Sequence, residues 1–108
     1  MKIDGGENND KIYSSGDNVT IDGGNGDDEL ENSWKENVTM FGGEGNDYLH
    51  NYYGENVTMS GGDGNDTLSN VNSSSDTLSG GAGNDSIYNA CSPYSSLSGG
   101  AGDDTLDN

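Results

Sequence analysis

The chain has 108 residues, of which 27% are apolar and 19 are glycine, and its formal net charge is −17. So few apolar side chains and so much like charge are typical of a disordered chain, unless a bound cation stabilises the fold. We expect no nucleic-acid partner and no membrane insertion, because the chain is acidic and lacks a long apolar run. The first residues contain no apolar stretch, so no signal peptide is expected, and the single cysteine argues against a disulfide or a cysteine-based zinc site.

A nine-residue phrase, Gly-Gly-x-Gly-x-Asp-x-(Leu/Ile)-x, recurs throughout the chain. Its six copies begin at Gly5, Gly23, Gly42, Gly61, Gly80 and Gly99, 18 residues apart at the first step and 19 at the other four. A fixed period of about twenty residues predicts a solenoid in which each repeat is one coil. We therefore expect residues 1–108 to form one all-β domain. Because no terminal cap is evident, we also expect it to be a segment of a longer protein, or a designed scaffold.

Each phrase ends in a three-residue segment with one apolar residue between polar neighbours, which predicts a very short strand with one inward side chain. The inward residues of this first row are Ile12, Leu30, Leu49, Leu68, Ile87 and Leu106. A second short strand should precede each later phrase, and its inward residues are Ile21, Met40, Met59, Leu78 and Leu97. Val19, Val38 and Val57 lie beside this second row, whereas Asp76 and Ser95 interrupt the valine column. We expect the wall to be wetter or distorted there.

Two strands and two turns in each 19-residue unit make one coil of a flattened parallel β-solenoid of about six coils. Successive coils should pair at roughly 4.8 Å, so the stack should be on the order of 25–30 Å long. One position after the first strand is asparagine in five of the six repeats, which predicts a stacked amide ladder. These residues are Asn32, Asn51, Asn70, Asn89 and Asn108.

The glycine phrase has the residues that a calcium loop needs. Calcium takes six to eight hard oxygen ligands at about 2.3–2.6 Å. Glycine permits the positive φ angles that turn several backbone carbonyls toward one point, and the aspartate adds negative charge. Two such loops stacked one coil apart would complete the ligand shell between them, which accounts for the recurrence of the phrase at the period of the solenoid.

The six phrases resemble the nonapeptide of the repeats-in-toxin (RTX) family, and the resemblance covers essentially the whole chain. It implies a right-handed parallel β-roll with calcium between successive glycine loops, in a family that is typically secreted. By position, the aspartate ligands that it implies are Asp10, Asp28, Asp47, Asp66, Asp85 and Asp104. The backbone carbonyls that it implies belong to Gly5, Gly6, Glu7, Gly23, Gly24, Asn25, Gly26, Gly42, Gly43, Glu44, Gly45, Gly61, Gly62, Asp63, Gly64, Gly80, Gly81, Ala82, Gly83, Gly99, Gly100, Ala101 and Gly102.

The spacing departs from the usual nine-residue tandem array, since about ten other residues follow almost every phrase. All six glycine loops should therefore lie on one edge of the solenoid and enclose five gaps. We expect up to five Ca²⁺, whose ten positive charges would bring the formal charge from −17 to −7. In the first loop, Asn8 stands at the fourth place of the phrase, where the other five phrases have glycine. Asparagine tolerates left-handed geometry, so we expect the calcium site of the first gap to be weakened but not excluded.

The sequence favours a calcium-induced structural module of a secreted or cell-surface protein. A surface-binding module, such as an adhesin or ice-binding segment, is the alternative. The third place of the phrase, where an ice-binding row would need threonine, holds none, and thermal hysteresis of the calcium-loaded protein would test that reading. An enzyme is disfavoured by the single histidine and single cysteine. Uncapped end coils could associate end to end.

Three aromatic residues, Trp34, Tyr52 and Tyr53, cluster in the turns opposite the glycine loops. We expect them to cover the core where valine and leucine are sparse. The alternative is an exposed contact patch.

Overall fold

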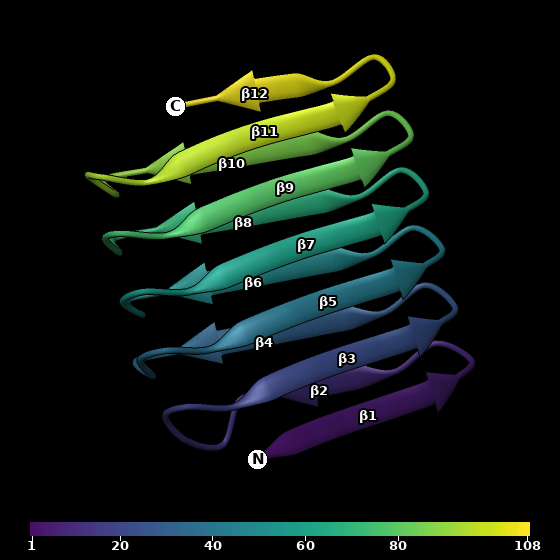
Figure 1. The fold of residues 1–108 in the computed structure, drawn as a ribbon, viewed down its shortest axis with the longest axis horizontal. Helices are drawn as coiled ribbons and strands as arrows, with labels where there is room; N and C mark the ends of the chain where they lie inside the picture. The colour runs from purple at the N-terminus through teal and green to yellow at the C-terminus, as the bar shows by residue number, and fades with distance from the viewer.

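Twelve strands make up the regular structure of residues 1–108 in the computed structural model, and none of the chain is helical (Figure 1). The strands are β1 (Lys2–Glu7), β2 (Lys11–Tyr13), β3 (Thr20–Asn25), β4 (Glu29–Ser33), β5 (Thr39–Glu44), β6 (Tyr48–Tyr52), β7 (Thr58–Asp63), β8 (Thr67–Val71), β9 (Thr77–Ala82), β10 (Ser86–Ala90), β11 (Ser96–Ala101) and β12 (Thr105–Asp107). They alternate between two sheets, so each pair of consecutive strands is one coil.

The two sheets lie face to face, and every neighbouring pair of strands within them is parallel. One sheet has the order β1-β3-β5-β7-β9-β11 and the other β12-β10-β8-β6-β4-β2. The register advances by 18 residues between the first two coils and by 19 between later ones, as in the pairs Ile3 with Ile21 and Ile21 with Met40. The predicted β-solenoid of about six coils is confirmed, as a slab of 32 × 30 × 14 Å.

The core follows the two predicted rows. Eleven apolar residues are buried between the sheets: Val19, Ile21, Leu30, Val38, Met40, Leu49, Val57, Met59, Leu68, Leu78 and Ile87. Alternation in the strands places these side chains inside, because successive residues of a strand point to opposite faces. At the two ends of the stack the rows are less covered. Ile3, Ile12 and Leu97 are half-buried, and Leu106 is exposed because no coil follows it.

Most strands are longer than the three residues that the sequence predicts for them. Strands β4, β6, β8 and β10 each have five residues, because the asparagine of the predicted ladder and its successor also pair. Strands β1, β3, β5, β7, β9 and β11 have six, because the first three residues of the glycine phrase continue the strand. Only the fourth to sixth residues of each phrase remain as a turn.

The predicted asparagine ladder is confirmed. Each asparagine Nδ2 donates to the Oδ1 of the next one along the stack, at 2.8 Å for the first three steps and 2.7 Å for Asn89 to Asn108. Asn51 also donates to Ser73 Oγ at 2.9 Å and is fully buried. Because buried amides are costly without partners, the ladder satisfies polar groups that a thin apolar core cannot avoid.

Asn51→Ala should lower the free energy of unfolding by about 2–4 kcal/mol, because it leaves amide groups of Asn32 and Asn70 buried without their partner. Thermal unfolding of the calcium-loaded protein measures this. Asn108→Ala is the matched control, since this exposed terminal asparagine makes a single ladder bond. Equal losses of stability in the two variants would contradict a buried-ladder role.

The interruption of the valine column forms a buried polar cluster. Asp76 is only 2% exposed. Its Oδ1 accepts the backbone N–H of Val57 at 2.8 Å, and its Oδ2 accepts from Asn70 Nδ2 at 2.9 Å. At Asp76, hydrogen bonds therefore replace the apolar contacts that valine makes in the earlier coils. The strands on either side remain in register.

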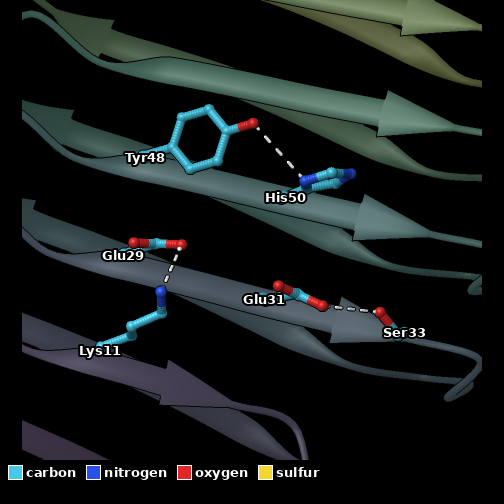
Figure 2. Close-up of polar contacts among 6 residues, drawn as sticks. All are labelled: Lys11, Glu29, Glu31, Ser33, Tyr48 and His50. Atoms are coloured by element: carbon cyan, nitrogen blue, oxygen red, sulfur yellow. Dashed lines mark hydrogen bonds and ion pairs between the residues drawn. The ribbon is translucent and has the colours of Figure 1, made fainter.

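The outward faces of the sheets are polar or aromatic. On the second sheet, Lys11 pairs with Glu29 at 3.3 Å, and Tyr48 Oη lies 3.5 Å from His50 Nδ1 (Figure 2). The prediction that Trp34, Tyr52 and Tyr53 cover the core is wrong, because these rings are 66%, 38% and 38% exposed. The asparagine ladder, rather than aromatic rings, closes the core on that side.

Candidate metal centre

The six glycine loops lie along one edge of the slab, as their spacing predicts. Each loop joins an odd-numbered strand to the next even-numbered strand, and the loops form a single file from the first coil to the last (Figure 1). We call this file the glycine edge, and the opposite file of turns, which follow β2, β4, β6, β8 and β10, the second edge.

The sixth residue of each phrase connects its coil to the preceding one. Asp28 Oδ1 accepts the backbone N–H of Asp10 at 2.8 Å, and Asp47 Oδ1 accepts that of Asp28 at the same distance. The pattern continues through Asp66 and Asp85 to Asp104. These bonds fix the orientation of every carboxylate in the file except that of Asp10, so that the other oxygen points in a defined direction.

The second carboxylate oxygen, Oδ2, is buried without any hydrogen-bond partner in five of the six aspartates. These are Asp10, Asp28, Asp47, Asp66 and Asp85. A buried carboxylate oxygen without a partner is costly, because it loses its hydration and gains nothing in return. A cation beside such an oxygen would serve as its partner, and five such atoms lie in one file.

Each of these oxygens lies close to a backbone carbonyl of the following coil. A Cβ atom built on Gly42 would collide with both Asp47 Oδ2 and the carbonyl oxygen of Gly61. Beside Gly5, Gly23, Gly61 and Gly80 the same two kinds of atom converge, an aspartate Oδ2 and the carbonyl oxygen of the first glycine in the next coil's phrase. Beside Gly99 only Asp104 is close, because no coil follows. The five predicted gaps thus each contain a cradle of hard oxygen atoms that any side chain in place of glycine would fill.

No group of three or more His, Cys, Asp or Glu side chains converges anywhere in the chain. Each gap has one such carboxylate Oδ2, and a backbone carbonyl oxygen of the next glycine phrase lies beside it. Oxygen donors of this kind suit calcium, which accepts carbonyl and carboxylate oxygens in flexible geometry.

Burial raises the pKa of three aspartates of this file, Asp28, Asp47 and Asp66. Desolvation is the main cause, and neighbouring carboxylates add to it, whereas the backbone N–H bond to each carboxylate acts in the opposite direction. The pKa of Asp47 and that of Asp66 rise to about 6, and the pKa of Asp28 is also raised. Without a cation, the edge is therefore a row of buried charges that destabilises the fold at neutral pH.

In the absence of calcium, lowering the pH from 7 to 5 should increase the folded fraction of the chain. The folded-state pKa values of Asp47 and Asp66 are about 6, above the ordinary aspartate value of 3.8. Folding therefore takes up protons between about pH 4 and 6, and the stability from this source is lost as pH rises through 6. Circular dichroism in chelator at pH 7, 6 and 5 measures the β signal, and Asp47→Asn/Asp66→Asn should flatten its rise toward pH 5. A β signal that falls toward pH 5 would contradict these assignments.

The fifth residue of each phrase forms a ladder that the sequence analysis did not predict. Asn9 Oδ1 accepts the backbone N–H of Asp27 at 2.8 Å, and Asp27 Oδ1 accepts that of Asn46. The same bond recurs up to Asp103. The fifth-place side chains bond toward the following coil, whereas the sixth-place ones bond toward the preceding coil. The signal was present in the sequence, because the fifth place is always asparagine or aspartate.

The first loop fits the file despite its missing glycine. Asn8 has a φ of 83°, in the left-handed region that the corresponding glycines also occupy. The hydrogen bond between Asp10 and Asp28 and the cradle beside Gly5 are both present. The first gap thus has the same donor atoms as the others.

Comparison with known proteins agrees with this geometry. The sequence profile described as RTX calcium-binding nonapeptide repeat (4 copies) matches residues 4–32, 35–51, 54–69, 71–88 and 95–108, most of the chain. No curated protein and no solved structure gives a match. The structure holds no helix with the length and apolarity needed to cross a bilayer. The chain therefore belongs to the RTX calcium-binding nonapeptide repeat family, a family of calcium-binding structural modules.

Proposed function

We propose that the glycine edge binds up to five Ca²⁺, one in each gap between successive coils, and that binding drives the chain to fold. The observation that carries this proposal is the file of five buried Oδ2 atoms without partners, each beside a carbonyl of the next coil. A divalent cation in each gap would supply the missing partner and neutralise the buried charge.

The residues of each gap have separate tasks in this proposal. The Oδ2 atoms of Asp10, Asp28, Asp47, Asp66 and Asp85 are the charged ligands, and carbonyls of the glycine phrases on both sides supply the rest. In all of these except Asp10, the Oδ1 atom holds its carboxylate in position through the backbone N–H of the preceding coil. Asp104 keeps this positioning role, but its Oδ2 faces no following coil in this chain.

Coupling to folding follows from composition and core size. Eleven buried apolar residues are few for a chain with a net charge of −17, and carboxylates of successive coils are stacked one above another. Because the gaps do not exist in the unfolded chain, the free energy of calcium binding adds to the free energy of folding. We infer a single structural domain, residues 1–108, that acts as a calcium-responsive segment of a secreted or cell-surface protein.

Calcium titration followed by circular dichroism tests this function. In excess chelator at pH 7 the spectrum should be that of a largely disordered chain, and added Ca²⁺ should produce a β spectrum in a cooperative transition. Mg²⁺ is the control, because it needs near-octahedral geometry and gives up its water reluctantly, and it should be far less effective. A chain equally folded with calcium and in chelator would contradict the proposal.

The coils at the two ends favour a calcium-dependent contact between copies of this 108-residue chain. Strands β1 and β2 at one end, and β11 and β12 at the other, each have one unpaired edge. Asp104 and the loop at Gly5 would together form a sixth cradle in such a contact. Sedimentation of the calcium-loaded protein over a range of concentrations measures this association, and a monomer throughout would contradict it.

A further inference from the structure

The second edge carries an aromatic stack that has no part in the proposed calcium site. Trp34 and Tyr53 occupy the same position in successive coils, with ring centroids 4.2 Å apart and planes 11° from parallel. Trp34 is 66% exposed and Tyr53 is 38% exposed, so both side chains reach solvent. The stack therefore contributes little to the core, and its rings are accessible to a partner.

Two carboxylates lie in the same shallow groove as this stack. The groove has a volume of about 470 Å³, and its lining includes Trp34, Tyr53, Glu36 and Glu55. Glu36 and Glu55 are opposite one another in a parallel bridge between coils. Like charges that face each other in this way repel, which makes a neighbouring positive charge favourable.

Neither carboxylate has an ion-pair partner in the chain, although Lys35 lies between Trp34 and Glu36 in the sequence. The two ion pairs of the chain join Lys2 to Asp22 and Lys11 to Glu29, both away from the groove. The chain has only three basic residues against 20 acidic ones. A negative field of this size attracts basic partners and increases their rate of association.

We propose that the groove of Trp34, Tyr53, Glu36 and Glu55 binds an arginine side chain of a basic partner protein. A guanidinium group is planar and stacks on aromatic faces, and its fork of N–H donors matches carboxylate oxygens. The groove provides both features, an aromatic stack and a pair of carboxylates without an ion-pair partner. The ammonium group of lysine is a compact point charge that uses the aromatic plane less well.

The fold does not require aromatic residues at these positions, which supports a role in recognition. Asn72 and Cys91 occupy the same position in the next two coils, with φ values of 53° that are close to the 63° of Trp34 and 58° of Tyr53. Asparagine accepts this left-handed conformation most readily, so Tyr53→Asn should fold as coil four does. This variant removes the aromatic stack without disturbing the backbone.

Fluorescence of Trp34, the only tryptophan, tests the proposal directly in the calcium-saturated protein. The probe is the blocked peptide Gly-Gly-Arg-Gly-Gly, and its control is the same peptide with citrulline, which keeps the shape but lacks the charge. The arginine peptide should change the fluorescence saturably and bind roughly tenfold more tightly than the citrulline peptide, with weaker binding at high salt. Equal binding of the two peptides, or no response to either, would overturn the proposal.

Variants then distinguish binding in the groove from general attraction of the arginine peptide to an acidic protein. Glu36→Gln/Glu55→Gln should abolish most of the preference for arginine over citrulline, whereas Asp4→Asn/Asp107→Asn removes the same amount of charge elsewhere and should preserve it. Tyr53→Asn should weaken the arginine peptide by several-fold, and circular dichroism with a calcium titration confirms that each variant is folded. If both double variants lost the preference for arginine equally, binding would rest on long-range attraction alone, and this would contradict the proposed site. An oligosaccharide that changes Trp34 fluorescence where the arginine peptide does not would also contradict it.

Discussion

Asp66→Asn should remove one calcium site and shift the calcium midpoint of folding upward by about tenfold or more, a factor that even outer-shell partners of metal ligands produce. The asparagine Oδ1 can still accept the backbone N–H of Asp47, so the bond between coils is kept. What is lost is the charged Oδ2, which lies buried beside the carbonyl of Gly80. Calcium-titrated circular dichroism gives the midpoint, and isothermal titration calorimetry gives the number of ions.

Asp104→Asn is the matched control, because it makes the same chemical change in the same loop of the last coil. Asp104 also accepts a backbone N–H, from Asp85 at 2.9 Å, but no carbonyl of a following coil faces its Oδ2. At protein concentrations where the chain is monomeric, stoichiometry and midpoint should therefore stay close to those of the parent. If both variants lost one ion, or neither did, the assignment of one Oδ2 to each gap would be contradicted.

Gly62→Ala should prevent close pairing of the third and fourth coils at the glycine edge and lower the melting temperature by at least about 10 °C. Gly62 has a φ of 109°, and a Cβ there would collide with the carbonyl oxygen of Gly43 and lie 3.1 Å from its carbonyl carbon. Both obstacles are backbone atoms, so no side chain can rotate away. Thermal unfolding of the calcium-loaded variant measures the effect.

Gly6→Ala separates the two sources of this cost. Gly6 occupies the same place of the phrase with a φ of 96°, but a Cβ there would meet nothing within 4 Å because no coil precedes it. Only the conformational strain of about 1–3 kcal/mol remains. A loss of stability in Gly6→Ala as large as in Gly62→Ala would show that strain, and not the spacing between coils, explains the glycines.

Periodicity made the fold readable from the sequence. Leu30, Leu49 and Leu68 are each one repeat apart, and stacking one repeat on the next as successive coils brings them together in one buried row. The asparagine column forms for the same reason. The one-sided glycine edge also followed from counting residues between phrases. These features depend on spacing, which a sequence states directly.

The remaining features depend on directions in space. The sequence indicates six aspartates, but it does not state that Oδ1 bonds to the preceding coil while Oδ2 faces the following one. The fifth-place ladder was missed because the identity of Asn46 does not state that its Oδ1 accepts a backbone N–H of the following coil. The exposure of Trp34 was mispredicted because composition alone favours burial of a large ring.

The parallel stack has a consequence for mechanical load. The termini lie at opposite ends of the stack, so a pulling force on them acts across the hydrogen bonds between coils (Figure 1). Coils should then detach from one end of the stack one at a time. Each would release 18 or 19 residues of unfolded chain and open one of the gaps proposed to hold calcium. Tension would thus be relieved in uniform steps, and the calcium concentration would set the force at which each step occurs.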